Sequence, residues 1–158
     1  IISDFDKWAI HILAKSNKRV VGTITLVLDS EKGLPIEKKF DLSAYRGGKI
    51  VEIDKLAVLP EKHGTAIAFD LTAMAYAIAR FWGAQKIFIF TLKKKTGNVV
   101  FYKKFGFKVL GEFELFNSEP AVAMVMDFSA GDTYEKKLTS TQLLQIARKL
   151  IGMTVMGE

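Results

Sequence analysis

The middle of the chain carries one helical segment between two apolar, strand-like runs, and no other feature limits the possible folds as much. The helical segment covers residues 64–82, and the runs cover residues 50–59 and 86–92. Apolar side chains recur in the helical segment at the 3.6-residue period that places them on one stripe: Ile67, Leu71, Met74, Ile78 and Phe81. Because a helix that joins neighbouring strands makes a right-handed crossover, the two strands are predicted to run parallel.

Hairpins are predicted on both sides of this unit. Residues 8–14 and 20–28 are apolar runs joined by a polar turn, and residues 108–116 and 121–128 form a second such pair. A short helix is predicted at residues 99–105. The strands of a hairpin are antiparallel. The sequence therefore predicts an α/β (α+β) domain with a mixed, mostly antiparallel twisted sheet, one parallel strand pair and flanking helices.

Two segments stand apart from this pattern. Residues 29–49 contain Gly and Pro and are predicted to form a long loop with one helical turn at residues 42–45; ordered loops of this length are usually functional or mobile. Residues 139–152 carry an amphipathic stripe and are predicted to form a C-terminal helix, which fits packing on its own domain or against a second subunit of a homodimer. With 158 residues, the chain has the length of a single domain, taken as residues 1–158.

Composition removes several classes of site. The chain has no cysteine and two histidines, so disulfides, thiolate nucleophiles and three-histidine zinc sites are excluded, and we expect no metal. No apolar run approaches the roughly 18 residues that a transmembrane helix needs. No secretory signal is recognisable near the first residue, so a cytoplasmic location is the default expectation.

The chain is basic, with 23 Lys and Arg against 17 Asp and Glu and a net charge of +6. This balance suits nucleic acid, an anionic membrane, or an acidic or phosphate-bearing ligand, and it equally serves solubility alone. The lysine clusters at residues 93–95 and 103–104 lack any nucleic-acid-binding motif, so we do not expect nucleic acid as a partner.

A turn before the central helix is the first candidate site. Lys62, His63, Gly64, Thr65 and Ala66 stand where free backbone amides and the helix dipole can hold a phosphate group. The alternative is a plain strand–helix turn in which Gly64 relieves backbone strain.

Two carboxylates and one tyrosine are the other candidates. Strict alternation in residues 50–59 places Glu52 and Asp54 on one face together with Leu56 and Val58. A carboxylate in a cleft can act as a general base, and the alternative is an ion pair with a lysine. Tyr102 can protonate a departing thiolate because its pKa is near 10, and the alternative is a core aromatic with its hydroxyl at the surface.

Two short motifs carry a resemblance to a known superfamily. Residues 61–66 read Glu-Lys-His-Gly-Thr-Ala, and residues 101–107 read Phe-Tyr-Lys-Lys-Phe-Gly-Phe. The first resembles the acyl-donor signature Q/R-x-x-G-x-G/A of the GNAT N-acyltransferases, with Glu61 in place of Gln or Arg, and the second resembles their F-Y-x-x-x-G-F segment. The order of predicted elements is also similar to the GNAT fold, whose parallel strands splay apart.

A narrower resemblance covers residues 20–58. Residues 52–58, Glu-Ile-Asp-Lys-Leu-Ala-Val, are similar to the E-x-x-R-x-x-V strand of the long-chain N-acyl amino acid synthases and the related acyl-homoserine lactone synthases, with Lys55 in place of the arginine. These enzymes take their acyl group from acyl carrier protein, an acidic partner that suits a basic chain. Compared with that family, the chain starts at the second strand, without the first strand and two helices.

The resemblance implies direct acyl transfer from an acyl carrier protein or CoA thioester to the amine of an amino acid or similar small molecule. Glu52 would accept the amine proton and Tyr102 would protonate the thiolate. Backbone groups of Leu56, Ala57 and Val58 would pair with the donor's phosphopantetheine arm, and residues 62–66 would hold its phosphate.

Two other functions stay open. One is a short-chain, acetyl-CoA-dependent N-acetyltransferase, and the other is a non-catalytic GNAT-like ligand-binding module. A long-chain enzyme needs an apolar tunnel, for which Phe88, Phe90 and Phe101 are the candidates, whereas an acetyltransferase needs that tunnel closed.

Overall fold

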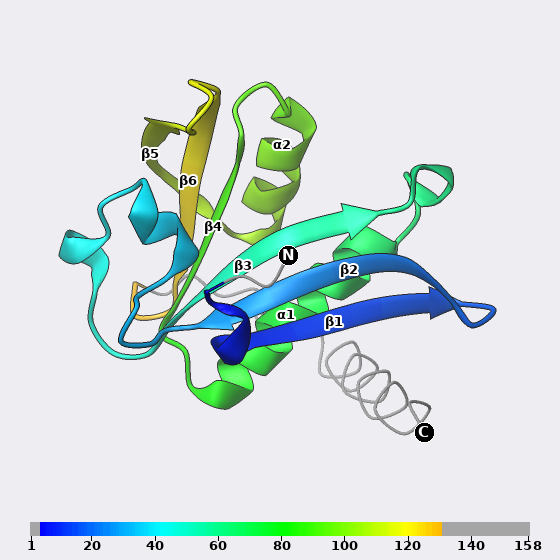
Figure 1. The fold of residues 1–158 in the computed structure, drawn as a ribbon, viewed down its shortest axis with the longest axis horizontal. Helices are drawn as coiled ribbons and strands as arrows, with labels where there is room; N and C mark the ends of the chain where they lie inside the picture. Colours follow the sequence, from blue (N-terminus) through cyan, green and yellow to red (C-terminus); the bar gives the residue numbers. More distant parts are fainter. Residues whose placement is uncertain (1–3, 131–158) are drawn as a thin grey trace.

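The computed structural model describes residues 4–130, which form one twisted six-stranded sheet with two helices on one face (Figure 1). Along the sheet the strand order is β1-β2-β3-β4-β6-β5. The elements are β1 Ala9–Ser16, β2 Arg19–Leu28, β3 Ile50–Val58, α1 Ile67–Trp82, β4 Lys86–Leu92, α2 Thr96–Phe105, β5 Lys108–Glu114 and β6 Pro120–Asp127. No helix within residues 4–130 has the length and apolar content needed to cross a membrane.

The strand directions confirm the predicted fold class. β3 and β4 are parallel, and the β1–β2, β2–β3, β4–β6 and β5–β6 pairs are antiparallel. α1 connects the two parallel strands, as the central strand–helix–strand pattern predicts. The sheet therefore consists of two antiparallel halves joined along one parallel seam.

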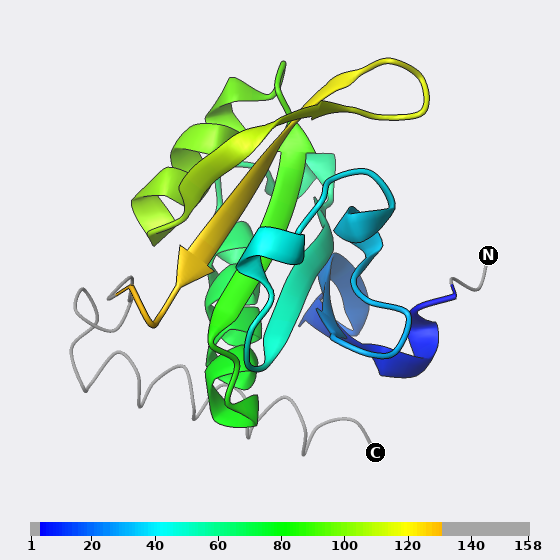
Figure 2. The same cartoon turned by 90° about the vertical axis from the view of Figure 1, so that its left-hand side faces the viewer.

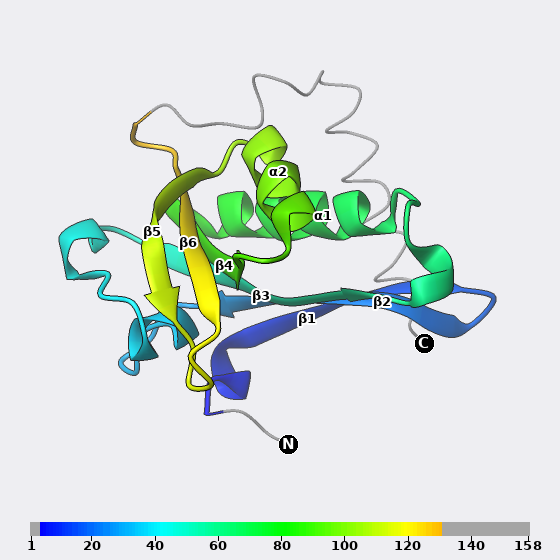
Figure 3. The same cartoon turned by 90° about the horizontal axis from the view of Figure 1, so that it is seen from above.

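α1 and α2 pack on the same face of the sheet, as Figure 3 shows from above. Leu71 and Met74 of the predicted helical stripe are buried, and Gly83 ends α1 in the left-handed conformation, with φ 87°. The expectation for Phe81 is wrong, because this side chain is 96% exposed and the stripe turns inward instead through Ala75 and Ala79. α2 begins earlier than predicted, at Thr96.

Residues 29–49 form a compact unit on the opposite face. Figure 2 shows this segment, drawn in cyan, and α1 on opposite sides of β3 and β4. It contains two short 3-10 turns, Pro35–Lys38 and Ser43–Tyr45, of which the sequence predicts only the second. Its apolar side chains, Leu34, Ile36 and Leu42, are buried against Ile50 and Phe88 of the sheet. The helix expected at residues 139–152 lies outside the described residues.

Candidate active site

β3 and β4 separate soon after they begin, and this creates the site. Their parallel register covers three residue pairs and ends where Glu52 lies opposite Phe88. Beyond that point β3 stays paired with β2 as far as Val58, while β4 stays paired with β6 as far as Leu92. Each strand therefore follows its own antiparallel partner, and a wedge opens between them.

A bulge in β3 marks the start of the wedge. Thr25 of β2 lies opposite Asp54, but Thr23, two residues away, lies opposite Ala57, so β3 holds one extra residue here. Lys55 takes up this extra residue in the left-handed conformation, with φ 53°. Its amide donates to Asp54 Oδ1 at 2.8 Å. A bulge of this kind bends the strand and increases its local twist.

The bulge also reverses which face each side chain occupies. Alternation predicts Leu56 and Val58 on the face of Glu52, and this prediction is wrong. Both side chains pack against the core cluster that contains Val51 and Ile53, on the helix side of the sheet. One inserted residue moves every later side chain to the other face, because the side-chain period of a strand is two.

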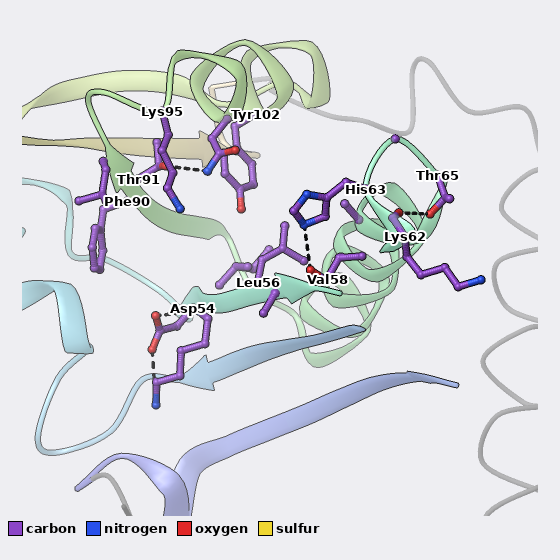
Figure 4. A pocket seen from close by; sticks show the side chains of 17 residues that line it. Asp54, Leu56, Val58, Lys62, His63, Thr65, Phe90, Thr91, Lys95 and Tyr102 are labelled. Carbon is purple, nitrogen blue, oxygen red and sulfur yellow. Dashed lines mark hydrogen bonds and ion pairs between the residues drawn. The ribbon is translucent and has the colours of Figure 1, made fainter. Parts of the chain in front are cut away.

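A cavity of about 650 Å³ occupies the wedge (Figure 4). Leu56, Ala57 and Val58 of β3 form one wall, and residues 90–92 of β4 line the other. The turn before α1 contributes residues 62–65, and Lys95, Asn98 and Tyr102 contribute from the start of α2 and its second turn. The structure thus brings together the residues that the sequence predicts for donor binding, except Ala66, and the predicted base Glu52 does not line this cavity either.

The turn at residues 62–66 leaves amides available at the cavity edge. The amides of Lys62, His63 and Thr65 are used inside the turn, by the carbonyls of Leu59, Pro60 and Lys62. The amides of Gly64 and Ala66 have no acceptor within residues 4–130. Gly64 has φ 78°, and no atom lies within 4 Å of the position that a Cβ would take. Free amides at the start of a helix, beside an open space, suit an anionic group.

His63 has a structural contact in this turn. Its Nε2 lies 2.9 Å from the carbonyl oxygen of Val58, the last residue of β3. The imidazole therefore ties the turn to the strand, as Figure 4 shows. The positive charges that line the cavity are those of Lys55, Lys62 and Lys95. No cluster of three potential metal ligands is present in residues 4–130.

Tyr102 points from α2 toward the wedge (Figure 4). The side chain is 7% exposed, and its ring packs edge-on against Phe101 and Phe107. Burial, together with the negative charge of Asp54, raises the pKa of Tyr102 to about 12. The phenol therefore holds its proton at neutral pH and its hydroxyl can donate a hydrogen bond into the wedge.

Asp54 is the carboxylate that lines the cavity. The sequence offers it together with Glu52 as a candidate general base, and the family resemblance gives that role to Glu52; the bulge follows directly after Asp54. Burial raises the pKa of Asp54, although Lys55 opposes this shift through its charge and its backbone hydrogen bond.

Glu52 lies behind the cavity, fully buried between β3 and the 29–49 segment. Its Oε2 accepts a hydrogen bond of 2.8 Å from the amide of Ile36, and its Oε1 has no partner within residues 4–130. Burial raises the pKa of Glu52 to about 8, with smaller contributions from the charges of Asp54 and Glu37, while the Ile36 hydrogen bond lowers it. Glu52 is therefore mostly protonated at neutral pH.

Of the phenylalanines proposed for an acyl tunnel, Phe88 and Phe90 belong to one apolar cluster and Phe101 to another. Phe90 lines the cavity, but Phe88 is fully buried under the 29–49 segment. Phe101 packs on Tyr102 and Phe105 of its own helix. The ring of Phe113 from β5 packs edge-on against Phe90, at a centroid distance of 5.6 Å.

Comparison with solved structures gives the same fold. The structure of FeeM, an N-acyl amino acid synthase from uncultured soil microbes, superposes with a TM-score of 0.69 and 22% identity, over 82% of this chain and 80% of that one. A GNAT family acetyltransferase from Elizabethkingia anophelis, with acetyl-CoA bound, gives 0.60 and 19% identity, over 78% of each chain. At these identities the likeness concerns the fold.

Sequence comparison gives the family. Uncharacterized N-acetyltransferases of Mycobacterium bovis and Mycobacterium tuberculosis are 39% identical over 61 residues, and this chain spans 39% of their length. The family model of N-acyl amino acid synthase FeeM matches residues 2–127, which is most of the chain. The chain therefore belongs to the FeeM family of N-acyl amino acid synthases, a group of N-acyltransferases with the GNAT fold.

Proposed function

We propose that this chain transfers a long-chain acyl group from an acyl carrier protein or CoA thioester to the amine of an amino acid or similar small molecule. The observation that carries the proposal is the wedge between β3 and β4, lined by the start of α1 at one end and by Tyr102. An elongated thioester arm fits such a wedge, because both strands present backbone groups to it that no neighbouring strand uses.

The donor would lie along the second half of β3. Backbone groups of Leu56, Ala57 and Val58 would hydrogen-bond the amides of its arm. The amides of Gly64 and Ala66 would receive its phosphate, with Lys62 supplying charge from the same turn. Lys95 at the start of α2 adds a second positive charge, which supports an anionic donor or an acidic carrier protein as partner.

In the reaction, the neutral amine attacks the thioester carbonyl carbon and the new C–N bond forms. A backbone amide of β3 beyond the bulge would stabilise the oxyanion. The ionised form of Glu52 would accept the proton that the amine loses, through a water linking it to the cavity, because its carboxyl group is buried and does not line the cavity. The C–S bond then breaks, and the leaving thiolate takes the phenolic proton of Tyr102, which solvent restores.

Asp54 has a different part in this scheme. Its carboxylate lines the cavity two residues along β3 from Glu52. An ionised carboxylate there would attract the ammonium form of the acceptor, which gives one proton to solvent and becomes the neutral amine before it attacks. Replacement of Asp54 should therefore change the acceptor KM more than kcat.

The first experiment is a thermal-shift titration with acetyl-CoA, palmitoyl-CoA and palmitoyl-acyl carrier protein, followed by mass spectrometry for N-acylated amino acids. A ligand that binds only the folded state raises the Tm by mass action. A shift with the two long-chain donors alone, together with an N-acyl product, supports the proposal. A shift with acetyl-CoA alone contradicts the long-chain preference. Absence of any shift and any product points to a non-catalytic module.

One observation favours acetyl transfer as the second candidate. Phe113 packs edge-on against Phe90 of the cavity wall, and Phe113 in turn contacts Phe40 of the 29–49 segment at 5.7 Å between ring centroids. A long acyl chain would have to move these rings, whereas an acetyl group would not. A small side chain in place of Phe113 should therefore improve turnover of long-chain donors if this ring is what limits the length of the acyl group.

A further inference from the structure

One arginine holds the 29–49 segment closed. The Arg46 guanidinium donates from Nη1 and Nη2 to the two oxygens of Asp29, both at 3.0 Å. It also donates from Nε and Nη2 to the two oxygens of Glu37, at 2.8 and 2.6 Å. Asp29 follows the end of β2 and Glu37 lies in the first 3-10 turn. One side chain thus joins three points of the segment with paired, charge-assisted hydrogen bonds.

The turn that Arg46 holds is the turn that contacts Glu52. Glu37 accepts a hydrogen bond of 2.7 Å from the amide of Leu34, and the residue between them in this turn, Ile36, donates its amide to Glu52. Leu34 and Ile36 are both buried. The position of the Ile36 amide is therefore set by the same short turn that Arg46 fixes through Glu37.

Arg46 also controls a charge that faces Glu52. The carboxylate of Glu37 raises the pKa of Glu52 from the segment side, as Asp54 does from β3 itself. The neighbours of Glu52 in the sheet register, Val27 on β2 and Phe88 on β4, carry no charge.

The ion pair between Arg46 and Glu37 also shifts the pKa values of these two residues. Burial alone would raise the pKa of Glu37, but hydrogen bonds from Arg46 and Leu34 and the charge of Arg46 hold it below its ordinary value. The same contacts, with Glu37 first and Asp29 second, raise the pKa of Arg46. Glu37 is therefore ionised beside Glu52, with Arg46 as its counter-charge.

We infer that Arg46 is a positioning residue for Glu52: it holds the Ile36 amide on the Glu52 carboxyl group and offsets the Glu37 charge that faces this group. Both effects favour the ionised form of Glu52, which is the form that accepts a proton. The inference rests on the proposed role of Glu52 as the base. It assigns a catalytic contribution to an ion-pair cluster that lies outside the cavity.

The test is the pKa of Glu52, measured by NMR of the full chain with carbon-13-labelled glutamate and assigned with Glu52→Gln. Arg46→Met should raise this pKa. The acid limb of the kcat profile should move to higher pH, so that a rise of about one pKa unit lowers the rate at neutral pH about tenfold relative to wild type. An unchanged Glu52 pKa in a folded Arg46→Met chain overturns the inference.

Two further variants separate charge from structure. The double variant Arg46→Met/Glu37→Gln removes the counter-charge together with the charge it offsets, so the Glu52 pKa should return toward its starting value. Lys38→Met is the matched control: Lys38 lies in the same turn and pairs with Asp4 at 3.7 Å, and its loss should leave the Glu52 pKa in place. A rise with Lys38→Met as large as that with Arg46→Met contradicts a specific role for Arg46.

If Arg46→Met does not fold, the conservative variant Arg46→Lys provides the test. Arg46→Lys keeps one positive charge but loses the paired geometry, so its Glu52 pKa should lie between those of the wild type and Arg46→Met. Arg46→Lys with a wild-type Glu52 pKa overturns the positioning part. The proposed function fails separately: if Glu52→Gln keeps full turnover, Glu52 is not the base, whatever Arg46 does to its pKa.

Discussion

The two halves of β3 have opposite surroundings. Residues 50–53 are buried, and Val51 and Glu52 among them are paired on both sides, by β2 and by β4, while residues 55–58 alternate between exposed and half-buried and keep β2 alone as a strand partner. The change happens at one bulged residue, Lys55. A single strand can therefore belong to the core at one end and to a binding site at the other, and the comparison suggests where each substitution should act.

Glu52→Gln, in the buried half, should have the largest effect. Glutamine keeps an oxygen to accept the Ile36 hydrogen bond but cannot accept the amine proton, so kcat should fall about 10²- to 10⁴-fold with little loss of stability. The measurement is N-acylation rate beside the Tm. Asp54→Asn, at the cavity, is the control and should act mainly on the acceptor KM. Equal kcat losses in the two variants would place the base at Asp54 instead.

The pH dependence of stability should follow from the same buried carboxyl group. Folding raises the pKa of Glu52 from 4.5 to about 8, so the folded state binds this proton more tightly than the unfolded state. The stabilisation is full below about pH 4.5 and is lost as the pH rises to about 8. Urea unfolding at pH 5 and pH 8.5 should differ by on the order of a few kcal/mol. In Glu52→Gln the contribution of Glu52 to this difference in unfolding free energy should vanish. A variant whose stability depends on pH as the wild type does would contradict the assignment to Glu52.

Tyr102→Phe should affect catalysis in the cavity beside the second half of β3 and leave the buried first half of β3 unchanged. The ring keeps its contacts with Phe101 and Phe107, so stability and donor KM should change little, while kcat should fall about 10- to 100-fold through loss of the acid. Steady-state kinetics with one donor measures this. Tyr76→Phe is a suitable control, because it removes a buried hydroxyl from α1 outside the cavity lining. Unchanged kcat in Tyr102→Phe would mean that water protonates the thiolate.

The smallest expected effect concerns the bulge itself. Lys55 has φ 53°, a conformation that is strained by roughly 1–2 kcal/mol for a side chain with a Cβ. Lys55→Gly should therefore stabilise the chain by up to about 1 kcal/mol, and Lys55→Val should destabilise it. Urea denaturation gives both numbers. Lys86→Gly, in the regular part of β4, should destabilise by about 0.5–1 kcal/mol. Destabilisation by glycine at both positions would argue against strain at Lys55.

The sequence predicts the first, buried half of β3 better than its second half, which lines the cavity. The element order, the parallel pair and the turn at residues 62–66 all depend on local period and glycine placement, which a single sequence carries. The bulge does not, because lysine gives no sign of a left-handed conformation that glycine or asparagine usually signals. The predicted face of Leu56 and Val58 therefore fails after Asp54.

Long-range contacts explain the other differences. Ile36 meets Glu52 across 16 positions of the chain, and Arg46 meets Asp29 across 17. No spacing rule connects such residues, so the sequence suggests a loop at 29–49 but not the buried turn that covers Glu52. Phe81 fits the helical period, yet its exposure depends on where the sheet ends beneath α1, which the helix sequence does not contain.

The short parallel register between β3 and β4 has a consequence for how the domain opens. With three residue pairs at the seam, the two antiparallel halves can fluctuate against each other more easily than either can unfold within itself. A donor arm in the wedge would supply hydrogen bonds to both halves at once, in the place of a missing strand. Amide hydrogens on both sides of the seam should then exchange more slowly together, so that substrate completes the sheet as well as occupying it.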